Sequence, residues 1–439
     1  MLRKFLLVIL VGASLSSSAQ QTMLTLEEAI SQALKNNFDI RLVRNDSASY
    51  AIDNSYAWAA FLPRVNGTAG RVWNSNAQKQ ELSNGTKRDT SGIKSTNLTG
   101  AINLNWTLFD GFRMFATRDK LAEFVRLGEL SVQSQIVNTV ASIRNNYYDI
   151  VRQKQQLKAI LDQMSINEER VKLSDRKLSV GLGAKPELLQ AKLDLNAQKA
   201  AVLQQNTLIE QLKGQLNQLI GFDLNSTGYD VSEEIPFDNN LSLETLRGNV
   251  SKGNPGLQVA SKNIDIARIT IRENKAGYYP VLSFNSAYNF SRTENNTVIN
   301  TFTPLFNQNR GLNYGIGLTV PILNGFNTTR LVRQSKLELQ YQQLVFENLR
   351  TQVDIGLNNS FKDYELQKKS LQLEEENIAL AKENVAIALE RYRQGVSTFL
   401  ELREAQKSLE DGYNRLIAAR YNLKLAETEL LRLTGALIR

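Results

Sequence analysis

The sequence predicts a mainly α-helical fold with a smaller amount of membrane β structure, arranged as two consecutive αβα half-repeats. Three observations predict it. The two halves of the chain repeat the same motifs in the same order, each half contains segments of alternating apolar and polar residues, and each contains one very long helical segment. Helical patterns longer than about 25 residues are typical of coiled coils and not of compact cores.

The composition excludes most catalytic chemistry. The 439 residues include no cysteine and no histidine, so a usual zinc site, a disulfide framework and a nucleophile paired with imidazole cannot form. The 52 Lys and Arg and 44 Asp and Glu give a net charge of +8, and they are interspersed along helical segments. These interspersed charges do not form the basic patch that binds a nucleic acid. An enzyme would have to act through carboxylates, lysines or a Ser-Lys pair. We expect no enzyme and no catalytic residue, cofactor, metal or nucleic-acid partner.

The chain begins with the pattern of a secretory signal. Arg3 and Lys4 precede an apolar run over residues 5–11, and small residues follow as far as Ala19. A charged start, a short apolar middle and a small-residue cleavage site predict a signal peptide over residues 1–19. The apolar run is too short to cross a bilayer. No later stretch reaches the 18 or so consecutive apolar residues of a membrane helix.

Aligning the chain with itself reveals a duplication. We predict a first repeat over residues 20–221, an equatorial linker over 222–241 and a second repeat over 242–439. The pairs of residues that carry the alignment are Asn37 and Asn254, Pro63 and Pro280, Gly181 and Gly395, Glu187 and Glu401, and Gly221 and Gly435. A repeat of about 215 residues is too long for a solenoid unit, so it indicates a duplicated domain.

Both repeats contain the same elements in the same order. Each opens with a short helix and a second helix that stops at a proline, because proline breaks helices. A β-hairpin and a long helical hairpin follow. The predicted ranges are 26–36 and 243–252 for the opening helices, about 64–109 and 281–323 for the β-hairpins, and about 112–220 and 326–434 for the helical hairpins. Polar loops of about twenty residues, over 75–95 and 293–310, are expected within the β-hairpins and are long for such turns.

The predicted strands have two different faces. In residues 312–320, and again in 98–108 and 282–290, apolar residues alternate with Asn, Ser, Thr, Ala or Gly, and residues 64–74 are assigned by symmetry. Outer-membrane barrels with a wet lumen have this pattern, and soluble sandwiches share it. Four strands cannot close a barrel, and an open edge in hydrocarbon leaves backbone groups unpaired. Several chains must therefore share one barrel, and three chains would supply twelve strands.

The helical segments indicate a second, α-helical barrel. About 69 residues over 112–180 would span about 100 Å, and the shorter helices placed end to end nearly match that length. A hollow cylinder would combine them. The 3.5-residue seam of the last helix supports coiled-coil packing. It consists of Leu402, Ala405, Leu409, Gly412, Leu416, Ala419, Leu423, Ala426, Leu430 and Leu433. The corresponding seam of the first repeat is weakened by Gln198 and Gln205. A fibrous dimeric coiled coil is the alternative.

These motifs together resemble the TolC-type outer-membrane efflux proteins over essentially the whole mature chain. The resemblance is carried by residues 176–182 followed by 187–191, 391–395 followed by 400–406, the ending 430–435, and the Gly-Phe pairs 111–112 and 325–326. It implies a homotrimer with a twelve-stranded β-barrel in the outer membrane of a Gram-negative bacterium. The barrel would contact outer-membrane lipid and continue into a long α-helical barrel across the periplasm.

The resemblance also implies a function. Such a protein is the passive exit duct of a tripartite efflux or type I secretion system. It is opened by a periplasmic adaptor, or membrane fusion, protein and an inner-membrane transporter. The alternative is a secreted coiled-coil adhesin or scaffold with small β modules, which would leave the protein soluble and unable to conduct ions.

By the same resemblance, individual residues acquire roles. The adaptor would contact the two helix-to-helix turns, which contain Val180, Gly181, Leu182, Gln394, Gly395 and Val396. A periplasmic gate would use Glu401, Glu404, Tyr392 and Glu187. The family's arginine two residues after the second glycine is replaced by Ser397, so the sequence leaves open whether ion pairs close the gate. The alternative is that the two glycines are only helix caps and that Glu401 and Glu404 are only solvated charges. Arg403, which lies between these two glutamates, would weaken their negative electrostatic field.

Overall fold

The computed structural model describes residues 23–223, 228–238, 240–297 and 302–438, so the predicted signal peptide lies outside the described residues. The chain divides into two compact units. One comprises Met1–Ser47, Gly128–Val259 and Phe346–Arg439, and the other comprises Ala48–Leu127 and Ala260–Val345. We call them the helical unit and the sheet unit. None of the helices in the described part of the chain holds an apolar stretch of the length that crosses a membrane.

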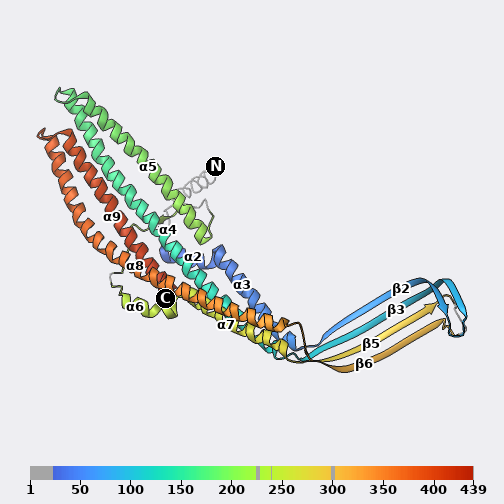
Figure 1. The fold of residues 1–439 in the computed structure, drawn as a ribbon. Helices are drawn as coiled ribbons and strands as arrows, with labels where there is room; N and C mark the ends of the chain where they lie inside the picture. Colours follow the sequence, from blue (N-terminus) through green and yellow to red (C-terminus); the bar gives the residue numbers. More distant parts are fainter. Residues whose placement is uncertain (1–22, 224–227, 239, 298–301, 439) are drawn as a thin grey trace, which may run out of the picture. The chain divides into compact units, whose positions relative to one another are not determined.

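The two halves of the chain have matching elements (Figure 1). The first half contains β1 Met23–Leu24, α2 Leu26–Asn36, α3 Phe38–Ser55, η1 Ala57–Phe61, β2 Arg64–Glu81, β3 Lys87–Phe109, α4 Arg113–Ser179 and α5 Lys185–Ile220. The second contains β4 Asp230–Val231, α6 Leu243–Gly253, α7 Pro255–Lys275, η2 Ala276–Tyr278, β5 Val281–Asn295, β6 Phe306–Thr319, α8 Asn327–Arg393, α9 Phe399–Thr434 and η3 Ala436–Ile438. The second helices stop short of Pro63 and Pro280, because a 3₁₀ turn precedes each proline.

The same strand-to-helix junction occurs in both halves. Gly111 and Phe112 both have positive φ, of 72° and 67°, and so do Gly325 and Phe326, at 61° and 59°. A left-handed conformation is unusual for an aromatic residue and persists only where its surroundings impose it. In the first half, the carboxylate of Asp110 accepts a hydrogen bond from the Met114 amide at 3.0 Å and so caps α4. The repeated Gly-Phe pair therefore sets how each strand enters its long helix.

The sheet unit contains one antiparallel sheet in the order β2-β3-β5-β6. The predicted twenty-residue loops are wrong. The ladder between β2 and β3 continues to the pair Glu81 and Lys87, and β5 and β6 remain paired as far as Glu294 and Phe306. Beyond the apolar band both faces are polar, so alternation disappears from the sequence although backbone pairing continues. A 2.9 Å ion pair between Lys79 and Asp89 lies on this extension.

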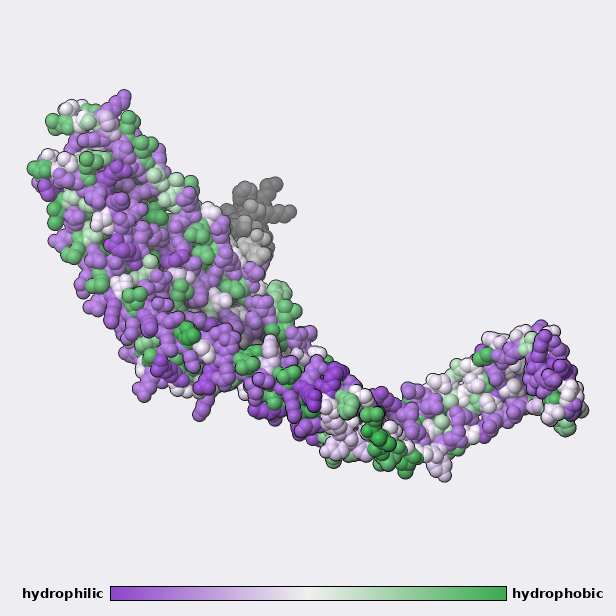
Figure 2. All heavy atoms as spheres, viewed as in Figure 1, coloured by the Kyte–Doolittle hydropathy of each residue, from purple (hydrophilic) through white to green (hydrophobic). Residues whose placement is uncertain are grey.

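Strand register gives the sheet one apolar and one polar face. The residues that share the apolar face include Val65, Ile102, Leu104, Trp106, Leu282, Phe284, Tyr288, Phe290, Leu312, Tyr314, Ile316 and Leu318. The opposite face carries Asn66, Asn103, Asn105, Asn285, Asn289 and Asn313 together with Thr, Ser and Gly. In Figure 2, hydrophilic residues cover the hairpin end of the sheet, and a hydrophobic patch marks the end that adjoins the helices. This two-sided sheet suits lipid on one side and water on the other.

The helical unit is built from two long hairpins, α4–α5 and α8–α9, which run side by side (Figure 1). All ten predicted seam residues of α9 are buried, and they pack on buried residues of α8 such as Leu357, Leu371 and Ile378. In the α5 seam, the two glutamines are only half-buried. Gln198 accepts a 2.6 Å hydrogen bond from Asn167, and Gln205 donates to the Gln153 side chain at 2.8 Å. Amide pairs therefore replace apolar contacts where the predicted seam is weakest.

Candidate functional site

The two helix-to-helix turns have the same backbone structure. After α4, the Leu182 amide donates to the carbonyl of Lys177 at 2.9 Å and the Gly181 amide donates to that of Leu178 at 3.1 Å. After α8, equivalent bonds run from Val396 to Arg391 at 3.0 Å and from Gly395 to Tyr392 at 3.2 Å. This pair of bonds is the Schellman motif, which requires a left-handed residue, and both glycines have φ near +76° (77° and 75°). The glycines are therefore helix caps, whatever else they do.

The turns present apolar side chains to solvent. Leu182 is 83% exposed, and Val180 and Val396 are also exposed. Leu400, in the first turn of α9, is exposed as well. Exposed apolar side chains gathered at a turn are a feature of interaction surfaces, because single-chain folding gives no reason to place them there. Three of the predicted adaptor-contacting residues, Val180, Leu182 and Val396, are therefore apolar and exposed in the structure.

Two of the three predicted gate acids, Glu401 and Glu404, lie at the start of α9. Glu401 is in its first turn, where its amide donates to the Thr398 hydroxyl at 3.3 Å, and its carboxylate lies 3.9 Å from Arg391. Both members of that ion pair are more than half exposed, so it contributes little stability. Glu404 follows one turn later and is exposed. Glu187 is half-buried in the first turn of α5, so the structure places it on the other hairpin.

Tyr392 is buried, unlike the acids. Its hydroxyl lies 3.2 Å from that of Ser174, and Lys177 on α4 donates to its carbonyl at 2.7 Å. The same Lys177 ammonium lies 3.8 Å from the centre of the Tyr392 ring, which is a cation–π contact. Tyr392 also packs with Phe399 and Leu402 in a small apolar cluster. It therefore joins the two hairpins just behind the turn.

A buried polar cluster that the sequence analysis missed lies next to these residues. Arg170 on α4 is only 1% exposed. Its guanidinium donates to Asp194 on α5 at 2.5 Å and to Gln406 on α9 at 2.8 Å, and it lies 5.0 Å from the centre of the Phe399 ring. Gln406 in turn donates to Asn167 at 3.3 Å. One buried charge thus connects both hairpins, and truncating its partners would leave that charge uncompensated.

A signal for this cluster was present in the sequence. Gln163, Asn167, Arg170 and Ser174 are spaced by four, three and four residues, and all four are buried. From sequence alone, a polar stripe at heptad spacing predicts a helix face in contact with water, because the helix that covers it is not known. The Arg170 cluster borders an open groove of about 860 Å³ between α5 and α9, whose wall also includes Glu401, Arg403 and Glu404. Glu401, Glu404 and the buried arginine therefore line one groove.

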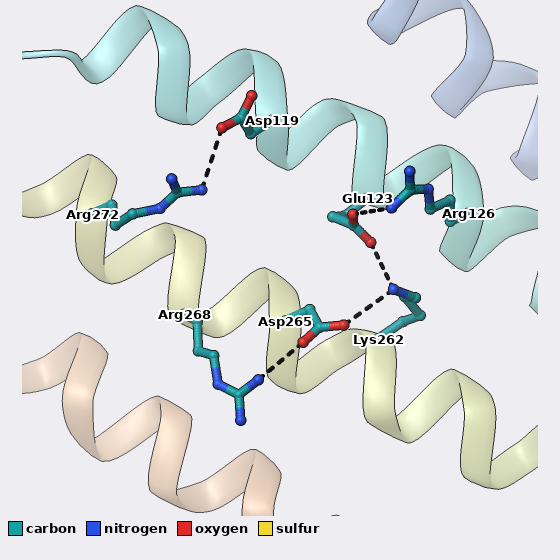
Figure 3. A network of polar contacts seen from close by, with 7 residues as sticks. All are labelled: Asp119, Glu123, Arg126, Lys262, Asp265, Arg268 and Arg272. Atoms are coloured by element: carbon teal, nitrogen blue, oxygen red, sulfur yellow. Dashed lines mark hydrogen bonds and ion pairs between the residues drawn. The ribbon is translucent and has the colours of Figure 1, made fainter.

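The sheet unit has a separate network of charges between α4 and α7 (Figure 3). The Lys262 ammonium donates to Glu123 at 3.0 Å and to Asp265 at 3.1 Å, while Arg272 reaches Asp119 at 3.4 Å. The hydrogen bond to Glu123, assisted by Asp265 and opposed by partial burial, raises the pKa of Lys262. The network links two helices and leaves its arginines exposed, and Glu123, Asp265, Arg268 and Arg272 also line an open hollow of about 490 Å³. We infer that it orients these two helices.

Comparison with known proteins identifies the fold and the family. The profile of the family described as "Outer membrane efflux protein" matches residues 29–222 and 246–436. The outer membrane protein TolC of Vibrio cholerae is 23% identical over 454 residues, which cover 99% of this chain and 96% of that protein. The proteases secretion protein PrtF of Dickeya chrysanthemi is 22% identical over 371 residues, covering 82% of this chain and 77% of that one.

Among solved structures, the CmeC outer membrane channel of Campylobacter jejuni superposes with a TM-score of 0.78 at 16% identity. The superposition covers 94% of this chain and 85% of CmeC. The predicted fold class is confirmed by this similarity, and family membership decides against the alternatives of a fibrous coiled coil and a secreted adhesin. The chain belongs to the outer membrane efflux protein family and is an exit duct in the outer membrane with a large periplasmic portion.

Proposed function

We propose that three copies of this chain form one passive channel whose twelve strands close a single barrel. The observation that carries the proposal is the open four-stranded sheet, with β2 and β6 as its edges and an exposed band of apolar residues on one face. Unpaired backbone groups at those edges would each cost several kcal/mol in hydrocarbon. Pairing β6 of one copy with β2 of the next removes every edge, and β2 and β6 have compatible lengths of 18 and 14 residues.

The proposal includes a duplicated chain architecture. The two repeats occupy residues 20–221 and 242–439, and the linker over 222–241 lies between them. The family match, which is divided into two segments with a gap in the same place, supports this division. So does the parallel pairing of β1 with β4, which ties the start of the first repeat to the linker. Each trimer would then contain six helical hairpins around one axis.

The channel works, in this proposal, with a periplasmic adaptor and an inner-membrane transporter. The exposed apolar side chains of the two turns support adaptor docking at Val180, Gly181, Leu182, Gln394, Gly395 and Val396. PrtF is named for the secretion of proteases. CmeC is described as an outer membrane channel. The first name is consistent with export of polypeptides, and in this proposal the adaptor and transporter determine what this channel exports.

Oligomeric state and conduction test the channel proposal together. Purified protein extracted from membranes should need detergent, scatter light with the mass of three chains and conduct ions in planar bilayers. A monomer that is stable in buffer without detergent and conducts no ions in bilayers would contradict the channel proposal. A crosslinker placed at Leu182 should capture an adaptor in the native cell envelope, and a crosslinker at Leu337, an exposed residue of α8 far from the turns in sequence, is the control.

The gate assignment makes a separate prediction. In a trimer, Glu401 and Glu404 would contribute six carboxylates around one axis, which attracts cations. We expect that Glu401→Gln together with Glu404→Gln lowers the cation-to-anion permeability ratio by about twofold or more and weakens block by divalent cations. Single-channel recordings with salt gradients measure both effects. Replacing the exposed acids Glu376 and Glu383 of α8 by glutamine removes the same charge and should change neither. Unchanged currents in the first variant would remove these two residues from the gate.

A further inference from the structure

Three arginines project from the apolar face of the sheet near its hairpin end. In the strand register, Arg71 on β2 lies in one row with Leu98 and with Arg292 on β5. Arg310 on β6 is paired with Phe290, one row closer to the helices. All three arginines are exposed. Because side chains alternate between the faces of a sheet, this register places them on the side that carries the apolar residues.

The three arginines, which we call the arginine row, lie at the end of the apolar band: Arg310 is beside its last residue, Phe290, and Arg71 and Arg292 lie one row beyond. Along β5 the outward residues run from Leu282 to Phe290, a distance of about 26 Å at roughly 3.3 Å per residue. That length is comparable to the apolar band of about 25 Å in outer-membrane barrels. The next outward residue is Arg292. The helices join the sheet at the other end of the band, so the row lies at the outer leaflet, where lipid headgroups are.

Aromatic rings support each arginine. Arg71 lies 5.1 Å from the centre of the Trp73 ring, Arg292 lies 5.1 Å from that of Phe306, and Arg310 lies 5.6 Å from that of Phe290. Arg292 also pairs with Glu294. Among the described residues, neither Arg71 nor Arg310 forms an ion pair, so no carboxylate neutralises either charge, and the guanidinium of Arg310 lies 2.9 Å from the side-chain amide of Gln308. Guanidinium groups held on rings at a membrane interface are suited to bind phosphate in two-point hydrogen bonds.

A hollow in the apolar face lies directly beside this row. It has a volume of about 380 Å³ and is lined by Gly67, Ala69, Gly100, Ile102, Tyr288 and Phe290. The small residues form its floor, because they occupy the outward positions of β2 and β3 in the two rows next to Arg71. The hollow therefore opens from the arginine row into the apolar band, as the acyl chain of a lipid would require.

We propose that the arginine row and this hollow bind a phosphorylated lipid of the outer leaflet, with an acyl chain in the hollow and phosphate on the arginines. Arg71 and Arg292 are two strands apart, about 10 Å. This spacing favours a glycolipid headgroup with two phosphates over one with a single phosphate. A closed trimer would carry nine such arginines. The inference rests on the proposed trimeric barrel, because only that arrangement exposes all three strands to lipid.

Native mass spectrometry of the purified trimer can test the inference. We expect diphosphoryl lipid A to bind at least about tenfold more tightly than a zwitterionic phospholipid, with monophosphoryl lipid A between them. The triple variant Arg71→Gln, Arg292→Gln, Arg310→Gln should lose that preference. Lys79→Gln, Lys87→Gln, Arg88→Gln removes the same charge at the hairpin end and should retain it. An equal loss in both variants would show general electrostatic attraction and overturn the proposal.

A second variant tests whether the hollow binds an acyl chain. A Cβ at Gly67 meets nothing within 4 Å, and one at Gly100 meets only the Thr68 carbonyl at 3.8 Å. Gly67→Val with Gly100→Val should therefore fold, fill the hollow and weaken lipid A binding by about tenfold with all arginines present. Unchanged binding would overturn the acyl-chain assignment. Displacement of lipid A by inorganic phosphate alone would show a simple anion site and overturn the lipid assignment. Light scattering and conductance of each variant report separately on the trimeric channel.

Discussion

Replacing Asp194 by alanine should destabilise the turn-proximal part of the helical hairpins by about 3–5 kcal/mol, the cost of breaking a buried ion pair. Arg170 would keep Gln406 and the Phe399 ring but lose the carboxylate that balances its charge. The guanidinium is almost wholly buried, so water from the adjoining groove can replace that partner only in part. Arg403, whose side chain lies 3.8 Å from the same carboxylate, loses a weaker contact.

Hydrogen exchange on the intact trimer measures this effect locally. Backbone amides of α4 around Arg170 and of α9 around Gln406 should exchange faster, because local opening becomes cheaper. Asp411→Ala, an exposed acid on α9, is the matched control and should leave exchange unchanged. The double variant Arg170→Met with Asp194→Leu should recover most of the loss, since an apolar pair of similar volume needs no counter-charge. If Asp194→Ala exchanges like the native protein, the cluster has no structural role.

Raising the pH from 10 to 12 should destabilise the helical unit through its buried tyrosines, of which Tyr148 and Tyr421 allow the effect to be measured residue by residue. Burial raises the pKa of Tyr148 to about 12, and burial likewise raises the pKa of Tyr421 to about 12. In the unfolded chain each ionises near 10, so between these values the unfolded state binds fewer protons and stability falls as pH rises. A shift of about two pKa units corresponds to about 2–3 kcal/mol for each tyrosine, fully lost only above pH 12.

Conservative variants can isolate this contribution. Tyr148→Phe and Tyr421→Phe keep the rings under the cations of Lys424 and Arg152 but remove the titrating hydroxyls. The fall in stability between pH 10 and 12, followed by denaturant unfolding and tyrosinate absorbance, should become shallower in each variant. Tyr341→Phe, at an exposed position on α8, should not change it. Burial also lowers the pKa of Lys424 from its usual 10.5, which makes stability rise with pH up to about that value, so the opposite sign distinguishes the lysine from the tyrosines.

Local features of the chain were accessible to sequence reasoning because local physics determines them. Heptad spacing predicted the ten buried seam residues of α9, since a helix must bury its apolar stripe. Gly181 and Gly395 marked the turns, since their left-handed backbone strongly favours glycine. Alternation located the apolar part of each strand. The same reasoning failed for the hairpin loops, because pairing beyond the apolar band leaves no pattern in the side chains.

The sequence by itself thus determined the order of elements, the duplicated motifs and the two-faced strands, all of which depend on residues close together in the chain. Only the tertiary structure decided which polar residues are buried. Arg170 and Gln406 are 236 residues apart, and their environment exists only once both hairpins have packed. The same holds for the row formed by Arg71, Arg292 and Arg310, because strand register is set by long-range backbone pairing that no local segment encodes.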